Sequence, residues 1–177
     1  MTVTTNDEQT LAIAVITVSD TRTPENDTSG DYLASAAEAA GHRVLSRAIV
    51  KDDIYQLRAC ASQLIANPDI KVVLMTGGTG FSGRDSTPEA MEPLFDKTID
   101  GFGELFRYLS FKEIGSSTVQ SRAFAGLAND TAIFCVPGST GACKTAWSGI
   151  LQEQLDARHK PCNFVGVLKT RTQIVSP

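Results

Sequence analysis

The chain has 177 residues, of which 42% are hydrophobic and 20% are charged, and its formal net charge is −4. A domain of this length buries roughly 70% of the surface that its unfolded chain exposes, so it needs no metal or disulfide to build a core. Because the cationic residues are spread along an acidic chain, nucleic acid and anionic membranes are not expected as main partners, and the longest apolar run, Leu11 to Ile16, is too short to cross a membrane.

The first ten residues lack the basic-then-apolar order of a signal peptide. We therefore expect a flexible leader over residues 1–10, a single domain over residues 11–177 and a cytoplasmic location. No Cys-x-x-Cys or paired-histidine spacing occurs, which argues against a zinc site. In a chain of this length without a signal peptide, the four cysteines are expected to be free thiols: Cys60, Cys135, Cys143 and Cys162.

Strands and helices alternate along the first half of the chain. Nearly continuous apolar runs predict strands that are buried on both faces, whereas an alanine-rich segment and an amphipathic segment predict helices between them. In chain order, the expected elements are a strand over 11–18, a helix over 31–40, a strand over 42–50, a helix that begins at Asp52 or Asp53, and a strand over 70–75.

The second half continues with helices and a hairpin. Thr87 is expected to cap a helix, because a residue before proline favours the extended backbone of an N-cap. Asn129-Asp130 between two apolar segments indicates a hairpin turn. The expected elements are a helix from Thr87 to about Phe95, a helix over about 102–109, a hairpin of 123–128 and 131–136, and a last helix after the segment 137–144.

This order predicts an α/β fold with a mostly parallel sheet, a β-hairpin and helices on both faces. Ligands of such sheets bind beyond the carboxyl ends of the strands. Three polar or glycine-rich segments follow strands directly and therefore predict a site at that edge: Ser19-Asp20, Thr76 to Gly80 and Pro137 to Lys144.

The loop Thr76-Gly-Gly-Thr-Gly80 lets a phosphate or another anion approach backbone N–H groups, although a tight turn between strand and helix needs the same glycines. Two familiar glycine motifs share the spacing from Gly78 to Gly83. However, Arg84-Asp85 stands where a Walker loop needs Lys and Ser/Thr, and no helix opens within the motif as a dinucleotide fingerprint requires. Neither of these nucleotide sites is expected.

Several residues beside these loops have two interpretations. Arg84 can clamp a phosphate and Asp85 can hold Mg²⁺, or the two can form a surface pair beside a capped helix. Asp52 opens a helix and is expected to cap it. The segment that begins at Pro137 is either an anion site or an ordinary helix start. Cys143 near that helix start would have a lowered pKa, but no histidine lies in these segments to act as its base.

Taken together, the segments resemble the MoaB/MogA family of molybdenum cofactor biosynthesis proteins over about residues 10 to 157. The glycine loop joined to Arg84-Asp85-x-Thr87-Pro88-Glu89 is the most specific element, and the stretch from Gly138 to Trp147 is similar to the MoaB branch in particular. The other matching segments are Ser19-Asp20, Asp27-x-Ser29-Gly30, Gly101-Phe-Gly-Glu-x-x-Arg107, Ser121-Arg122 and Pro137-Gly138.

The resemblance implies a three-layer sandwich of the molybdopterin-binding type that assembles as a homo-trimer or homo-hexamer. It also implies, for active members, that Mg-ATP and molybdopterin give adenylylated molybdopterin and pyrophosphate. ATP and molybdopterin would be the substrates, Mg²⁺ the cofactor, and the product would pass to the molybdate-inserting enzyme. The aromatic residues between Phe95 and Phe111 indicate a subunit contact there. The alternative is a pterin-binding or scaffold protein without catalysis of its own.

The resemblance assigns the two acidic positions of the family to Asp85 and Asp52, as catalytic residues and Mg²⁺ ligands, with Asp53 as the alternative to Asp52. Phosphoryl transfer is catalysed mainly by positioning and charge stabilisation, so glycine loops, carboxylates and one metal suffice. The implied substrate-binding residues are Ser19, Asp20, Ser29, Thr76, Gly77, Gly78, Thr79, Gly80, Arg84, Thr87, Pro137, Gly138 and Ser139.

Overall fold

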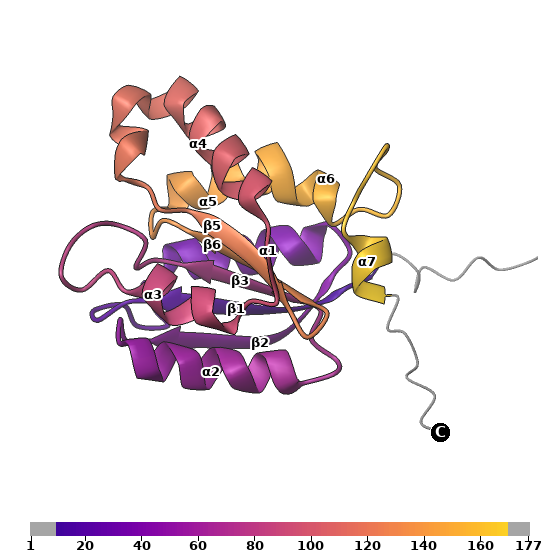
Figure 1. Cartoon of the computed structure of the whole chain (residues 1–177), viewed down its shortest axis with the longest axis horizontal. Helices are drawn as coiled ribbons and strands as arrows, with labels where there is room; N and C mark the ends of the chain where they lie inside the picture. Colours follow the sequence, from indigo (N-terminus) through magenta and orange to yellow (C-terminus); the bar gives the residue numbers. More distant parts are fainter. Residues whose placement is uncertain (1–9, 170–177) are drawn as a thin grey trace, which may run out of the picture.

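The computed structural model describes residues 10–169 (Figure 1), so the predicted leader, Thr10 excepted, and residues 170–177 lie outside the described part. Within it, six strands form one sheet in the order β2-β1-β3-β6-β5-β4. The strands are β1 (Ala12–Val18), β2 (Arg43–Val50), β3 (Val72–Thr76), β4 (Lys97–Thr98), β5 (Phe124–Ala128) and β6 (Thr131–Val136).

Helices connect these strands and cover the sheet. The α-helices are α1 (Thr28–Ala39), α2 (Ile54–Ala66), α3 (Thr87–Met91), α4 (Asp100–Ile114), α5 (Thr140–Ala146), α6 (Gln152–Gln154) and α7 (Val165–Lys169). A π-helical stretch, Trp147–Leu151, joins α5 to α6, and 3-10 turns follow α3 and α4 over Glu92–Leu94 and Gly115–Gln120. None of the helices in residues 10–169 is long and apolar enough to span a membrane.

The sheet is mostly parallel and ends evenly at one edge. Strands β2, β1, β3 and β6 are parallel neighbours, and their register places Thr17 opposite Thr76 and Thr76 opposite Val136. The segments that follow these strands therefore leave the sheet side by side. Strands β5 and β6 pair antiparallel as the predicted hairpin, with Asn129 and Asp130 at φ 48° and 60° in its turn.

Two separate cores show that the fold has three layers. One core packs α1, α4, α5 and α7 on one face of the sheet, around Phe106, Phe134 and Trp147. The other packs α2 and α3 on the opposite face, around Leu57 and Met91. Figure 1 shows α2 below the sheet and α4, α5 and α6 above it. Strands β1, β3 and β6 lie between the two cores and are buried along their length, as their apolar sequences predict.

The structure differs from the expected elements mainly at helix ends. Helix α1 begins at Thr28 rather than 31, because the carboxylate of Asp27 accepts a hydrogen bond from the backbone N–H of Gly30 and caps the helix. The predicted cap at Thr87 is wrong: Ser86 holds the cap position and Thr87 is already helical. Helix α4 extends beyond 102–109 at both ends, and β4 and α7 were not predicted.

Candidate functional site

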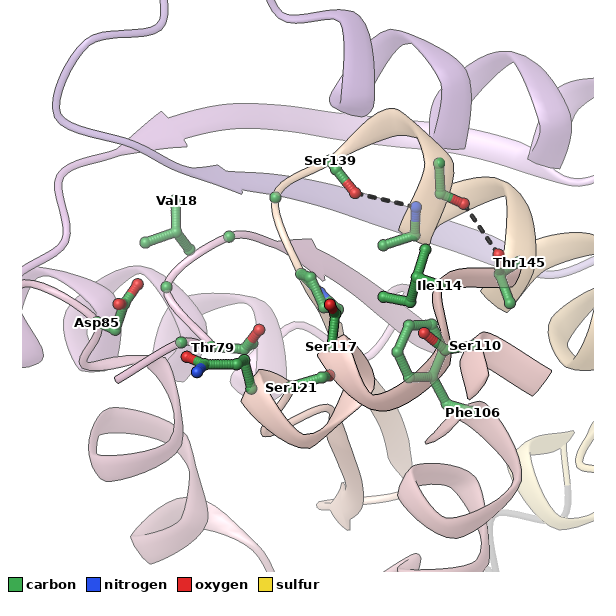
Figure 2. Close-up of a pocket in the computed structure, with 18 of the residues that line it drawn as sticks. Val18, Thr79, Asp85, Phe106, Ser110, Ile114, Ser117, Ser121, Ser139 and Thr145 are labelled. Atoms are coloured by element: carbon green, nitrogen blue, oxygen red, sulfur yellow. Dashed lines mark hydrogen bonds between the residues drawn. The ribbon is translucent and has the colours of Figure 1, made fainter. Parts of the chain in front are cut away.

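A cavity of about 490 Å³ opens at the carboxyl edge of the sheet. One wall is the glycine loop with Asp85, and a second is the turn that leads from β6 into α5. Figure 2 shows the third wall, where Phe106, Ser110 and Ile114 of α4 face the cavity together with Ser117 and Ser121. A volume of this size is typical of small-molecule sites.

The cavity brings together most of the residues predicted to bind substrate. The predicted residues that line it are Ser19, Gly77, Gly78, Thr79, Gly80, Asp85, Pro137, Gly138 and Ser139. They come from the ends of three different strands, which confirms that the three segments meet at one edge. Ser19 also lines a neighbouring cavity of about 680 Å³, together with Asp20, Arg22 and Lys51.

Three predicted residues are buried behind the cavity instead of lining it. Thr76 donates to the carbonyl of Pro137 at 3.0 Å and accepts from the thiol of Cys143 at 3.2 Å, so it ties two loops together. Thr87 donates to the carbonyl of Gly77 at 2.9 Å. Ser29 is buried in the first turn of α1. These three side chains shape the loops from behind.

The glycine loop needs its glycines for its own packing. Gly77 and Gly78 have φ of +108° and +67°, a region that other residues rarely adopt. A Cβ at Gly78 would collide with the hydroxyl of Thr87 and lie 2.7 Å from a carboxylate oxygen of Asp52. The sequence suggested that a ligand approaches the backbone closely at Gly78. The structure adds that packing against Thr87 and Asp52 also requires glycine at this position.

The choice between Asp52 and Asp53 follows from the start of α2. Asp53 caps this helix, since its carboxylate accepts from the backbone N–H groups of Tyr55 and Gln56 at 3.0 and 2.9 Å. The expectation that Asp52 would cap the helix is therefore wrong. Asp52 turns toward the glycine loop and accepts from both the backbone N–H and the hydroxyl of Ser86.

Asp85 is held on the same loop. One of its carboxylate oxygens accepts from the backbone N–H of Ser82 at 2.7 Å and lies beside Gly80. Partial burial would raise the pKa of Asp85, but hydrogen bonds from Ser82 and Gly80 and the charge of Arg122 outweigh this and lower the pKa. Asp85 is therefore ionised at neutral pH, as a ligand for a cation must be.

Arg84 does not point into the cavity. Its guanidinium donates two hydrogen bonds to the carboxylate of Asp20, at 2.9 and 2.8 Å. This pair joins the loop after β1 to the loop after β3, and Asp20 also accepts from the backbone N–H of Asp52. A substrate role for Arg84 or Asp20 stays a prediction.

Arg122 was not among the predicted site residues, yet it holds the loop that carries Asp85. Its guanidinium donates to the carbonyls of Gly80 and Asp85 at 2.8 and 2.9 Å and pairs with the carboxylate of Glu89. The centre of the Phe81 ring lies 5.1 Å from the guanidinium carbon. The only sequence signal was its place in the Ser121-Arg122 motif.

The second predicted anion site begins α5. Ser139 caps this helix, because its hydroxyl accepts from the backbone N–H of Ala142 at 3.1 Å. The cap interpretation is therefore confirmed, and a ligand role for Ser139 stays a prediction. The expected lowering of the Cys143 pKa is wrong, since burial raises the pKa of this thiol to about 11.

The carboxylates at the glycine loop fit a cation that takes most of its ligands from the substrate and from water. No group of three or more His, Cys, Asp or Glu that could hold a metal occurs in residues 10–169. Asp52 and Asp85 are two carboxylates against one glycine loop. Mg²⁺ is commonly bound in this way, by one or two carboxylates, with phosphate oxygens and water as its other ligands.

Comparison with known proteins agrees with this geometry. Residues 14–157 match the family model described as "Probable molybdopterin binding domain", so the fold is that of this family. The chain belongs to the MoaB/MogA family of molybdenum cofactor biosynthesis proteins. It is 58% identical over 157 residues to molybdenum cofactor biosynthesis protein B of Escherichia coli (strain K12), a match that covers 89% of this chain and 92% of the relative.

Solved structures give the same result. A crystal structure of molybdenum cofactor biosynthesis protein B has 43% identity and a TM-score of 0.79, and the match covers 82% of this chain and 91% of that one. The structure of the tungsten cofactor synthesizing protein MoaB from Pyrococcus furiosus has 37% identity and a TM-score of 0.73, over 82% and 92% of the two chains. These matches confirm the expected three-layer fold and the resemblance to the MoaB branch.

Proposed function

We propose that this protein transfers the adenylyl group of Mg-ATP to molybdopterin. In this reaction an oxygen of the terminal phosphate of molybdopterin attacks the α-phosphorus of ATP. The bond to the β-phosphate oxygen breaks, and adenylyl-molybdopterin and pyrophosphate are released. The observation that carries the proposal is that two carboxylates contact one glycine loop: Asp85, which lines the cavity, and Asp52, which is buried beside Gly78 and does not line it.

The residues present divide the task between them. Asp85 and Asp52 would hold Mg²⁺, which when bound neutralises phosphate charge. The backbone around Gly77 to Gly80 and the start of α5 would hold phosphate groups of the substrates. The loop keeps this geometry through Ser86 and Arg122, and positioning of this kind supplies much of the rate of phosphoryl transfer.

Two neighbouring cavities suit a reaction of two substrates. Both include Ser19, and the larger one also has the basic side chains of Arg22 and Lys51. We therefore propose that the pterin occupies the smaller cavity and that the nucleotide occupies the larger one. In this arrangement Ser19 and Asp20 would lie between the reacting phosphates.

Incubation of the purified protein with molybdopterin and Mg-ATP tests the proposal directly. We expect pyrophosphate and an AMP adduct of the pterin in equal amounts, and neither product when EDTA removes the metal. Pterin binding without any pyrophosphate would contradict adenylyl transfer. It would support the alternative, a pterin-binding or scaffold protein of the same pathway.

We also propose that the chain works in the cytoplasm as a homo-trimer or homo-hexamer and passes its product to the molybdate-inserting enzyme. Apolar side chains are exposed on α4 and on the 3-10 turn after it: Leu105, Tyr108, Phe111, Ile114 and Val119. A surface of this kind is typical of protein contacts. Light scattering after size exclusion should give a mass that is a multiple of three chains, and a monomer at micromolar concentration would contradict this.

A further inference from the structure

The end of the cavity that lies away from the glycine loop has a chemistry of its own. Figure 2 shows Asp85 at one end and Thr145 at the other, with Thr79, Ser117 and Ser121 between them. At the second end, Thr145 of α5 donates a hydrogen bond of 2.7 Å to a carboxylate oxygen of Glu113, which comes from α4. Glu113 itself lines the cavity.

Glu113 is a carboxylate without a cationic partner in the part of the chain whose side chains the structure describes. Among the described residues that line the cavity, Asp85 and Glu113 are the two with charged side chains. No Lys, Arg or His of residues 10–168 forms an ion pair with Glu113, and the neighbouring Lys112 instead places its ammonium 4.2 Å from the ring centre of Tyr108. Glu113 is therefore able to accept hydrogen bonds from a ligand.

The shape of a carboxylate selects a particular ligand edge. Its two oxygens lie in one plane and accept two parallel N–H groups at once, as they do from guanidinium. A 2-amino-4-oxo-pyrimidine ring offers this pair, through its ring N–H and its exocyclic amine. The side chain of Ile114, which is 56% exposed, lies in the same wall as the buried Phe106 and provides apolar surface for a flat heterocycle.

We propose that Glu113 determines which ligand the cavity accepts, by binding the 2-amino-4-oxo edge of a fused pyrimidine ring, and that Thr145 orients its carboxylate. The heterocycle then lies between α4 and α5, and the phosphate end of the ligand points toward the glycine loop. This inference rests on the proposed function only in that the ligand is a pterin. It does not require adenylyl transfer.

Binding of simple ring compounds tests this assignment without molybdopterin. The probes are 6-hydroxymethylpterin, which has the 2-amino group, and 6-hydroxymethyllumazine, in which an oxygen replaces it and would face the carboxylate with lone pairs. Titration calorimetry of the wild type should give a Kd for the pterin about 10- to 100-fold lower than for the lumazine, the range expected of a bidentate pair.

The variant Glu113→Gln should remove this preference. We expect its Kd for the pterin to rise about 10-fold or more, while its Kd for the lumazine changes by less than about 3-fold. The matched control is Glu104→Gln, an exposed glutamate on the same helix that does not line this cavity, and it should keep the wild-type preference. Unchanged melting temperatures would show that both variants are folded.

Titration with a further ligand distinguishes the possible outcomes. GMP presents the same ring edge, so binding of GMP tighter than that of the pterin would identify a guanine nucleotide as the natural source of this edge. A Glu113→Gln variant that still prefers the pterin, or a wild type that does not distinguish pterin from lumazine, would overturn the inference. If the wild type prefers the pterin through Glu113 but shows no transferase activity, only the proposed reaction is contradicted.

Discussion

The glycine-loop end of the cavity and the end between α4 and α5 differ in how firmly their side chains are held. Around the glycine loop, Arg122, Ser86 and Thr87 connect the loop to other segments through hydrogen bonds to carbonyls and carboxylates. At the other end, the hydrogen bond from Thr145 to Glu113 joins two helices, and Ile114 beside it is 56% exposed.

This difference suits the two tasks that we propose for the cavity. Catalysis of phosphoryl transfer requires groups held within a fraction of an ångström, and a dense network provides this. Ligand recognition requires a matching edge and an apolar wall, and a few well-placed polar groups are sufficient for it. We therefore expect substitutions at the first end to affect turnover and substitutions at the second end to affect ligand choice.

The largest expected effect is that of Asp85→Asn. This change keeps the shape of the side chain but removes the charge that a hard cation requires, so adenylyl transfer should fall by at least ~100-fold, or about 2.7 kcal/mol of transition-state stabilisation. Pterin binding without nucleotide should change little, and the free energy of unfolding by less than ~1 kcal/mol. Near-wild-type turnover would refute the proposed role of Asp85.

Asp52→Asn should lower turnover in the same way. No helix cap is lost in this variant, because Asp53 caps α2. The companion change Asp53→Asn is a matched control, since asparagine is also a good N-cap and the residue faces its own helix. Turnover that falls more with Asp53→Asn than with Asp52→Asn would reverse the assignment of the second carboxylate.

Arg122→Gln should have an intermediate effect. It removes the guanidinium that fixes the carbonyls of Gly80 and Asp85, so turnover should fall by about 10-fold, and the free energy of unfolding should fall by about 1–3 kcal/mol. Arg122→Lys keeps the charge but not the planar fork, and should recover only part of the turnover. The control is Arg107→Gln, which loses a hydrogen bond to the carbonyl of Ala123 and not to the carbonyls of Gly80 and Asp85. If both variants reduce turnover equally, Arg122 is merely structural.

Gly78→Ala tests the packing of the glycine loop. The new Cβ would collide with Thr87 and approach Asp52, and the positive φ adds strain, so we expect a loss of about 1–3 kcal/mol in the free energy of unfolding. Gly83→Ala is the control, because nothing lies within 4 Å of a Cβ there. Urea denaturation of both variants gives the comparison. Equal free energies of unfolding for the two variants would mean that the loop accommodates a Cβ at Gly78.

The smallest expected effect is the absence of a reaction at Cys143, which lies behind the cavity at the junction of α5 with Thr76 of β3. Its thiol is buried and its pKa is raised to about 11, so iodoacetamide at pH 7.5 should not modify it in the native protein. The exposed Cys162 should react readily and serves as the internal control. Peptide mass spectrometry distinguishes the two. Rapid labelling of Cys143 would indicate that this junction opens.

Local patterns were sufficient to predict the buried strands, the hairpin and the edge of the sheet where the site lies. They failed for β4, because a strand of two residues is defined by its pairing with β5 rather than by its own sequence. They also failed for Arg122, whose contacts lie 33 to 42 positions away in the sequence. Contacts over such distances have no local pattern that would reveal them.

By itself, the sequence determined which segments meet at the site, because hydrophobic periodicity and glycine spacing are properties of neighbouring residues. Only the tertiary structure decided what each side chain does there. Asp52 and Asp53 are adjacent and chemically alike, yet one faces the glycine loop and the other caps a helix. The reason is physical: side chains of adjacent residues point in different directions, and which carboxylate reaches Ser86 depends on how α2 packs against the sheet.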